Sequence, residues 1–385
     1  MTNEHIHEGL VEIEIPQFDK VSSDAPVFYN PVMELNRDLS ILALQEFQKE
    51  LDKEIYLCDA FGGSGIRGIR YAKEISNVAK VVINDISSLA VNFQESNIKL
   101  NCLNNVETSQ NDASLMLRDM RGEFDIIDID PFGTPSYYTD SVAYSLKSDG
   151  MLCISATDTS ALCGTYKAPC IRKYNAKPFK SEYCHENGIR ILIGFVAMTF
   201  AKYKKYIEVK FSHSTEHYMR AYIKIHRGSK ATDESLENMG FIVHCKKCLH
   251  RETINGLAPH IPNVCPVCGE KLITAGPLWL GDIQNKEYIQ GMIDLSDEKN
   301  LNKKDDALKL LNLCLNEAEM PATFYDLHVI CKKLRVSAVR LSKVVDALTI
   351  EGFKVSRTHY EPTAIKTDAS LEKIEEIILK LNLEL

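Results

Sequence analysis

The chain has 385 residues, which suits two or three domains, and its 45% hydrophobic and 25% charged residues are typical of a soluble globular protein. No apolar run approaches the roughly 18 residues that a membrane span requires. The polar stretch from Met1 to Gly9 lacks the apolar core of a signal peptide. We therefore expect a protein that is neither membrane-spanning nor secreted.

The net charge of −8 is unusual for a nucleic-acid-binding protein, but the charge is unevenly distributed. Residues 164–251 carry 17 Lys and Arg against 7 Asp and Glu, a local balance of +10. This basic segment predicts a polyanionic partner bound locally, and a solvated basic face is the alternative. The twelve cysteines, mostly single within apolar segments, favour a reducing cytoplasm. No feature indicates an obligatory protein partner.

At the N-terminus, Val11, Ile13 and Ile15 alternate with polar residues and predict a half-exposed strand. Further along, Asn30 can cap a helix that has Pro31 at its first position. This helix is expected to continue to about residue 49.

Strands and helices then alternate along the chain. Strands are predicted at residues 55–60, 80–85, 106–108, 124–130 and 151–156. This βαβα rhythm predicts an α/β fold in which a parallel sheet is covered on both faces. A helix over 188–201 and an antiparallel hairpin, 206–211 with 219–226, are expected to complete the sheet at its edge.

A glycine-rich loop follows the first of these strands and is typical of a nucleotide-containing cofactor site. The candidate cofactor site consists of residues in this loop and at the carboxyl ends of the first three strands: Asp59, Gly63, Gly65, Gly68, Asp85, Asp112 and the backbone of Ala113. Both NAD and S-adenosylmethionine fit this arrangement. Asp85 and Asp112 taken singly are also explained as helix caps.

The fourth strand ends in Asp130-Pro131-Phe132-Gly133, which decides between the two cofactors. Pro131 stiffens the turn, Gly133 lets the backbone turn away, and Phe132 offers a flat ring for stacking. A carboxylate acceptor beside such a ring suits an amino group that receives a methyl group. We therefore expect S-adenosylmethionine as the cofactor.

Four cysteines, Cys245, Cys248, Cys265 and Cys268, form two Cys-x2-Cys pairs separated by sixteen residues. This spacing predicts a structural Zn2+ site with four thiolate ligands. Cys58, Cys153 and Cys163 are interpreted as packing residues, and the eleven histidines show no metal-ligand spacing.

Beyond residue 303 the pattern predicts three helices followed by a small β-wing, a winged-helix-like unit. We expect an N-terminal catalytic domain at 1–228 and a C-terminal α+β domain at 229–385. The latter comprises a zinc module at about 241–281 and the winged-helix-like unit at about 303–385. Basic and aromatic residues interleave at 202–206, with further cations at Lys167, Arg172, Lys173, Lys177 and Lys180, and this suits phosphate contact and base stacking.

With these motifs and the stretches at 9–16 and 27–38, the chain resembles the tRNA guanine-N2 dimethyltransferases that modify guanosine 26. The resemblance implies a class I (Rossmann-like) methyltransferase fold, S-adenosylmethionine as methyl donor and tRNA as partner. It implies cofactor contacts at Arg37, Arg67, Asp85, Asp112 and Ala113. It also implies a target guanine held between Phe28 and Phe132, with Asp130 on its amino group. Whether one or two methyl groups are added follows from the family alone.

Two other classes of function remain open on the residues themselves. An amino-group methyltransferase acting on another RNA, on DNA adenine or on protein glutamine would use a similar acidic-Pro-aromatic turn. An RNA-binding or zinc-bridged scaffold protein is the non-enzyme alternative, and the acids at the strand ends argue against it.

Overall fold

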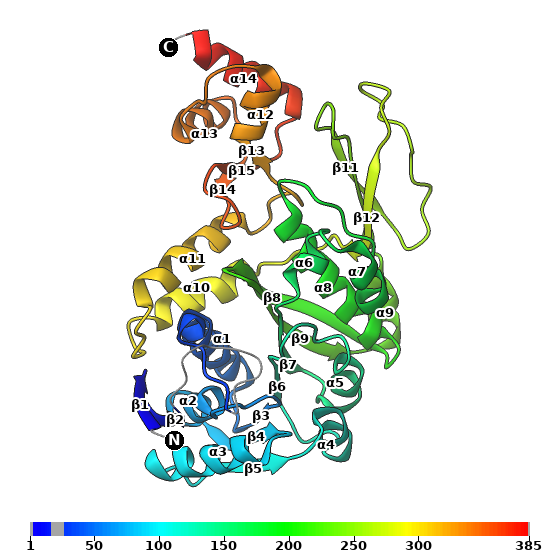
Figure 1. Ribbon diagram of the computed structural model, residues 1–385. Coiled ribbons are helices and arrows are strands. Elements are labelled where there is room, and N and C mark those ends of the chain that lie inside the picture. Colours follow the sequence, from blue (N-terminus) through cyan, green and yellow to red (C-terminus); the bar gives the residue numbers. More distant parts are fainter. Residues whose placement is uncertain (1–2, 17–26, 384–385) are drawn as a thin grey trace.

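A seven-stranded mixed sheet forms the centre of the molecule in the computed structural model, which describes residues 3–16 and 27–383 (Figure 1). Its strands are β3 (Ile55–Asp59), β4 (Val78–Asp85), β5 (Val106–Gln110), β6 (Ile126–Ile129), β7 (Gly150–Ala156), β8 (Lys205–Thr215) and β9 (Tyr218–Arg227). The order is β5-β4-β3-β6-β7-β9-β8, in which β3 to β7 are parallel and β8 and β9 antiparallel. The predicted parallel sheet and edge hairpin are confirmed.

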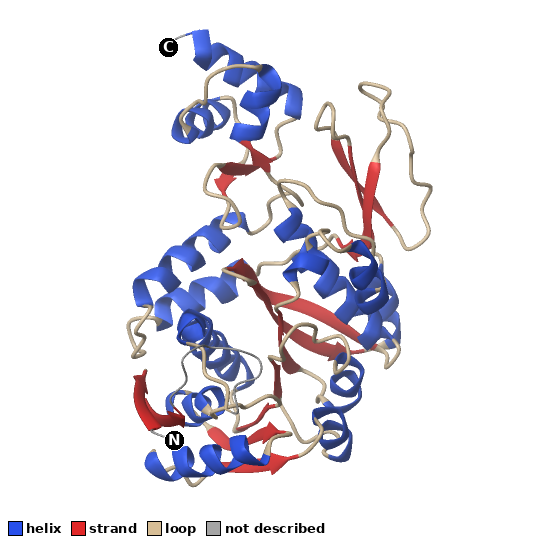
Figure 2. Cartoon of the chain, in the orientation of Figure 1, coloured by secondary structure: helices blue, strands red, loops and turns tan. Residues whose placement is uncertain are grey.

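Helices cover both faces of this sheet, as Figure 2 shows. The helices associated with it are α1 (Glu34–Leu51), α2 (Ile66–Glu74), α3 (Ser88–Leu100), α4 (Ala113–Asp119), α5 (Thr139–Ser145), α6 (Thr159–Leu162), α7 (Lys167–Tyr174), α8 (Cys184–Ala201) and α9 (Ser229–Leu236). Side chains of α1 and α2 pack with Leu57 and Ile126 on one face. Those of α4, α5 and α8 pack with Ile127 and Leu152 on the other. Alternate residues of β6 thus enter different cores, which explains its continuous apolar character.

The N-terminal segment lies against the outside of α2 and α3. Strand β1 (Asn3–Glu8) pairs with β2 (Val11–Pro16), and the apolar side chains of β2 are buried as predicted. The Asn30 side chain accepts a hydrogen bond from the Val32 N–H at 3.0 Å and caps a 3-10 turn, Pro31–Met33, that leads into α1. The predicted capping is confirmed, whereas β1 was not foreseen.

The C-terminal part contains two smaller sheets and five helices. Strands β10 (Met239–His244), β11 (Arg251–Asn255) and β12 (Ile273–Trp279) form one sheet; β13 (Tyr325–Asp326), β14 (Val355–Arg357) and β15 (Ala364–Thr367) form the other. The helices are α10 (Lys286–Leu295), α11 (Lys304–Glu317), α12 (Leu327–Leu334), α13 (Leu341–Ile350) and α14 (Leu371–Leu383). The expected pairing of the wing strands is confirmed by β14 and β15.

Helices α10 and α11 differ from the remainder of the C-terminal part because they pack on α1 and share its core. Helices α12 to α14 lie together at the far end of the molecule (Figure 1). Their buried side chains, among them Leu348 and Ile374, form a separate core. Helices α10 and α14 had not been predicted. No helix within residues 3–16 and 27–383 is both long and apolar enough to cross a bilayer.

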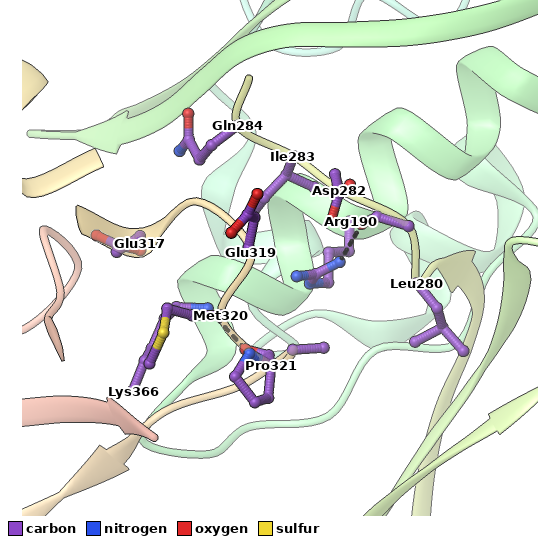
Figure 3. A pocket seen from close by; sticks show the side chains of 12 residues that line it. Arg190, Leu280, Asp282, Ile283, Gln284, Glu317, Glu319, Met320, Pro321 and Lys366 are labelled. Atoms are coloured by element: carbon purple, nitrogen blue, oxygen red, sulfur yellow. Dashed lines mark hydrogen bonds between the residues drawn. The ribbon is translucent and has the colours of Figure 1, made fainter. Parts of the chain in front are cut away.

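A buried ion pair joins α8 to β15. Lys366 Nζ donates to Glu186 Oε1 at 2.8 Å, and Arg190 Nε donates to the same oxygen at 2.9 Å. Both cations line a polar cavity of about 220 Å³ that is bounded also by residues 280–284 and 319–322 (Figure 3). Burial alone would raise the pKa of Glu186, but the charges of Lys366 and Arg190 lower it to about 2. The carboxylate is therefore held ionised inside the protein.

Replacement of this lysine, Lys366→Met, should lower the free energy of unfolding by about 3–5 kcal/mol, since it leaves a buried carboxylate with one cation fewer. The folded-state pKa of Glu186 lies below its usual value of 4.5. The stabilisation is therefore complete above pH 4.5 and lost as the pH falls towards 2. Thermal unfolding at pH 7 and pH 3 should show the difference between wild type and variant shrinking at the lower pH. Lys230→Met, at a lysine whose side chain is 93% exposed, is the control and should change little.

Candidate active site

The carboxyl ends of the parallel strands bring the predicted acids to one edge of the sheet. Asp59 ends β3, Asp85 ends β4, Asp112 follows β5 and Asp130 follows β6. The strand order reverses between β3 and β6, so this edge contains the topological switch point at which open α/β sheets bind ligands. The juxtaposition expected from the sequence is present.

The glycine loop between β3 and α2 is shaped by contacts that exclude side chains. Gly63 has φ +51°, and a Cβ there would lie 2.9 Å from the carbonyl oxygen of Phe28. A Cβ at Gly68 would lie 2.6 Å from Ile83 Cγ1. The absence of a side chain at Gly68 therefore allows α2 to pack closely on β4. The Ser64 N–H donates to the Phe28 carbonyl at 3.1 Å. The loop thus holds the backbone of Phe28, a role for Gly63 that the glycine pattern did not reveal.

Asp85 and Asp112 both shape the local backbone. Asp85 accepts hydrogen bonds from the N–H groups of Gly63 and Ser87, both at 2.9 Å. Asp112 caps α4 through the Leu115 N–H at 3.1 Å, directly before Ala113. The helix-cap interpretation is therefore correct for Asp112. It does not exclude a ligand, because each carboxylate oxygen has two lone pairs and both acids remain partly or fully exposed.

Asp59 lies beneath the loop instead of on its surface. It is 1% exposed, and its Oδ2 accepts from the Gly68 N–H at 3.0 Å. Burial, and then the charge of Asp128, raise the pKa of Asp59 to about 7. In this structure Asp59 fixes the shape of the glycine loop.

Arg67 joins the helix α2 to the predicted catalytic turn. Its guanidinium donates to Asp130 Oδ2, to Asn36 Oδ1 at 2.9 Å and to Ser40 Oγ at 3.1 Å. The Asp130 side chain is 16% exposed, whereas Arg67 is buried. The orientation of the Asp130 carboxylate is therefore set by a buried cation from another element.

A second buried arginine lies directly below this pair. Arg220 Nη1 and Nη2 donate to the two oxygens of Asp128 at 2.7 Å each, and the Tyr71 hydroxyl donates to Asp128 at 2.5 Å. Arg67 Nη1 lies 3.7 Å from Asp128 Oδ2. Burial would raise the pKa of Asp128, but Arg220 and Arg67 lower it. We call Asp128, Arg220, Arg67 and Asp130 the charge ladder. Asp128 and Arg220 were not predicted from the sequence, in which the available signal was an acid, Asp128, inside an apolar strand.

Arg37, expected to contact the cofactor, is engaged by a residue from the N-terminal hairpin. Its Nε and Nη2 donate to the Glu8 carboxylate at 2.5 and 2.6 Å. Arg70 Nη1 donates to Glu8 Oε1 at 2.8 Å and also pairs with Asp38. Glu8 had not been singled out, although it is fully buried.

Phe28 and Phe132, predicted to enclose the substrate base, are in direct contact. Their ring centroids are 4.4 Å apart with an interplanar angle of 81°. A base stacked between two parallel rings needs them roughly 7 Å apart, two contacts of about 3.5 Å. Phe132 is 54% exposed, and the following Gly133 has φ +80° and donates its N–H to Thr157 Oγ1 at 2.7 Å. The two rings therefore lie together at the site but leave no slot for a base between them.

The basic segment is only partly available to a ligand. Arg190, Lys205, Lys210 and Arg220 are buried, and Lys205 Nζ donates to the carbonyls of Ala143 and Leu146. Burial lowers the pKa of Lys205 to about 8. Six exposed cations remain on or near α7 and at the end of α8: Lys167, Arg172, Lys177, Lys180, Lys202 and Lys204. The interpretation of 202–206 as a ligand-binding tract is therefore wrong at Lys205.

The four predicted zinc ligands come together at one end of the β10–β12 sheet. Cys245 Sγ lies 3.4 Å from Cys268 Sγ, and Cys248 Sγ lies 3.5 Å from Cys265 Sγ. Two turns of the same form present them, with Leu249 N–H donating to Cys245 O at 2.9 Å and Gly269 N–H to Cys265 O at 3.0 Å. Four thiolates at this spacing fit a tetrahedral metal site.

The comparisons with known proteins agree with one another. Residues 9–379 match the family described as N2,N2-dimethylguanosine tRNA methyltransferase. This chain belongs to that family. A tRNA (guanine(26)-N(2))-dimethyltransferase of Methanobrevibacter smithii is 62% identical over 98% of this chain and 97% of its own length. The enzyme of that name from Methanothermobacter thermautotrophicus is 52% identical over 98% of both chains.

A solved member of the family has the same fold. Trm1 from Pyrococcus horikoshii, solved in complex with S-adenosyl-L-methionine, matches with a TM-score of 0.87 and 34% identity, covering 97% of this chain and 99% of that chain. The chain therefore has the fold of a methyltransferase of this family, and the resemblance noted in the sequence is confirmed.

The contact between Gly63 and Phe28 can be tested without a ligand. Gly63→Ala should destabilise the protein by more than Gly122→Ala, because both glycines have positive φ but only Gly63 faces an atom, the Phe28 carbonyl oxygen, within 3 Å. The measurement is the midpoint of thermal unfolding of the two variants against wild type. Equal midpoints would mean that the loop does not hold Phe28.

Proposed function

We propose that this chain transfers methyl groups from S-adenosylmethionine to the exocyclic N2 of guanosine 26 in tRNA, and that it adds two. Family membership supports the reaction. The structural observation that best supports this reaction is the position of the Asp130-Pro131-Phe132 turn. Arg67 holds the turn at the carboxyl edge of the sheet, beside the glycine loop.

The cofactor site of the proposal is the loop and the strand ends around it. The glycines at 63 and 65, both with positive φ, allow close approach of the backbone, and Asp85 keeps lone pairs for ribose hydroxyls. Asp112 and the Ala113 backbone are proposed to hold the adenine. Exposed Ile86, 73% accessible and next to Asp85, offers an apolar surface for that ring. The site is supported from within the protein by three buried side chains, those of Arg37, Asp59 and Arg67.

The methyl acceptor is proposed to bind through its amino group. Since Arg67 engages Oδ2 of Asp130, Oδ1 is left to accept one N–H of the guanine amine. The carbonyl of Pro131 accepts the other. Both acceptors orient the amine so that its lone pair, delocalised into the ring at rest, points away from them and towards the donor.

S-adenosylmethionine supplies an electrophilic methyl group on a sulfonium sulfur. As the bond from N2 to this carbon forms, the carbon–sulfur bond breaks and its electron pair stays on sulfur. Positive charge develops on N2, and the Asp130 carboxylate stabilises it and takes the proton that N2 loses. Arg67 keeps the carboxylate in position throughout.

The substrate must reach this turn out of a folded RNA. A stacked base costs a few kcal/mol to flip, and stacking on aromatic rings returns roughly 1–3 kcal/mol per base. We propose that Phe28 and Phe132 separate from their edge-to-face contact and enclose the flipped guanine. The exposed cations Lys167, Arg172, Lys177 and Lys180 are proposed to contact tRNA phosphates.

The finer organisation of the C-terminal part belongs to the same proposal. We propose a boundary near residue 228, a zinc module with the four cysteines as ligands, and a winged-helix-like unit built from α12, α13, α14 and the β13–β15 sheet. The thiolate set fits Zn2+, which would brace the two turns that carry it. The cytoplasm, where tRNA is modified, is the proposed location.

The decisive experiment uses unmodified tRNA transcript, labelled S-adenosylmethionine and nucleoside analysis. Dimethylguanosine at position 26 is expected, with no product from a transcript that has adenosine there. Methylated adenine, or label found only in protein, would indicate another amino-group methyltransferase.

The role of Asp130 predicts that Asp130→Asn lowers kcat by at least about 100-fold, because the carboxylate charge is lost while the shape is kept. Binding of S-adenosylmethionine, measured by calorimetry, and of tRNA should stay near wild type. Asp233→Asn, at an exposed acid of α9, is the matched control. A variant Asp130→Asn with near-normal kcat would refute the assigned role.

The proposed stacking predicts that Phe132→Ala lowers kcat/KM for tRNA by about 5–150-fold, which corresponds to the loss of 1–3 kcal/mol of stacking. The affinity for S-adenosylmethionine should not change. If both fall together, Phe132 supports the cofactor site and not the base.

A further inference from the structure

A group of two cysteines and a histidine lies outside both the candidate active site and the four-cysteine cluster. Cys163 follows α6, and Cys184 and His185 are the first two residues of α8. One donor atom from each lies within 4.8 Å of the others, and Cys163 Sγ is 3.7 Å from His185 Nδ1. This group could not be recognised in the sequence, because 20 residues separate Cys163 from Cys184 and the histidines show no ligand spacing.

The spacing is that of a preformed metal site. Zinc binds cysteine sulfur at about 2.3 Å and histidine nitrogen at about 2.0–2.1 Å, so ligands at the corners of a tetrahedron stand roughly 3.5 Å apart. The four-cysteine cluster has sulfur separations of 3.4 and 3.5 Å, and the 3.7 Å between Cys163 and His185 is similar. Cys184 and His185 are half-buried, which gives an ion a path of entry.

A comparison within the protein argues against simple hydrogen bonding. Cys314, Glu317 and His359 form another close group, but His359 Nδ1 bonds Glu317 Oε1 at 2.7 Å and its Nε2 accepts from the Ser214 N–H at 3.3 Å. Those contacts occupy both ring nitrogens. His185 Nδ1 has only longer contacts, 3.7 Å to Cys163 Sγ and 3.4 Å to Ser214 Oγ.

We propose that Cys163, Cys184 and His185 bind a second Zn2+ ion, with solvent beside Ser214 in the fourth position. Two thiolates and an imidazole are ligands that zinc prefers over the harder cations. The site ties the loop after β7 to the N-terminus of α8. The same loop holds the catalytic turn, because the N–H groups of Thr157 and Asp158 donate to the Gly133 carbonyl at 2.9 and 3.3 Å.

The proposed role is therefore to brace the turn that carries Asp130 and Phe132 through the loop that holds Gly133. The ion would be structural. Its presence does not depend on the proposed methyl transfer, because zinc content is measured without substrate.

Zinc per chain, measured by elemental analysis of the full chain after dialysis against buffer with trace Zn2+, tests the proposal. Wild type should contain two ions, Cys184→Ser one, Cys265→Ser one and the double variant none. Cys170→Ala, at a neighbouring buried thiol outside the group, should keep two. One ion in wild type that Cys265→Ser abolishes, with Cys184→Ser unchanged, would overturn the proposal.

A measurement on the wild-type chain covers the case in which Cys184→Ser fails to fold. Alkylation under native conditions, mapped by mass spectrometry, should leave Cys184 protected in the zinc-loaded chain and modified after treatment with a strong chelator. Equal modification of Cys184 in both states would refute the site, whatever happens at the four-cysteine cluster. Exposed Cys102 should react equally in both and reports the efficiency of labelling.

Discussion

The pairing of two buried arginines with a buried aspartate, Asp128, and a partly exposed one, Asp130, is the constraint on which the arrangement of the active site depends. In the charge ladder, Arg220 of β9 neutralises Asp128 of β6, and Arg67 of α2 connects Asp128 to Asp130. Removing Arg220, Arg67 or Asp128 would leave an unpaired buried charge, which costs about 3–5 kcal/mol. The ladder therefore fixes the position of α2, the sheet edge and the catalytic turn relative to one another.

The N-terminal segment is organised by the same physical rule. Glu8 is buried only because Arg37 and Arg70 reach it from α1 and α2. This pairing holds the N-terminal hairpin against the two helices that flank the glycine loop. The hairpin, the loop and the Phe28 backbone consequently meet at one place, so that a residue far from the catalytic turn in the sequence delivers an aromatic ring to it.

The structure also separates groups that support the site from groups that can touch a ligand. Asp59 and Lys205 have ionisable side chains but lie within the protein. Asp59 accepts a hydrogen bond that fixes the glycine loop, and Lys205 donates to backbone carbonyls at α5. Asp85, Asp112 and Phe132 retain exposed surface. Glu186 and Lys366 join α8 to β15, so the helix whose first turn carries Cys184 and His185 is anchored to the C-terminal part of the chain.

The sequence by itself determined the alternation of strands and helices, the collection of acids at one sheet edge, the capping at Asn30 and the four-cysteine cluster. Each depends on residues close together in the chain or on the period of apolar side chains, which local geometry dictates. Only the tertiary structure decided that Arg67 binds Asp130, that Glu8 holds Arg37, that Lys205 is buried and that Phe28 touches Phe132. These contacts join residues between 29 and 104 positions apart, or pair a side chain with distant carbonyls, and their stability comes from burial, which no single stretch of sequence records.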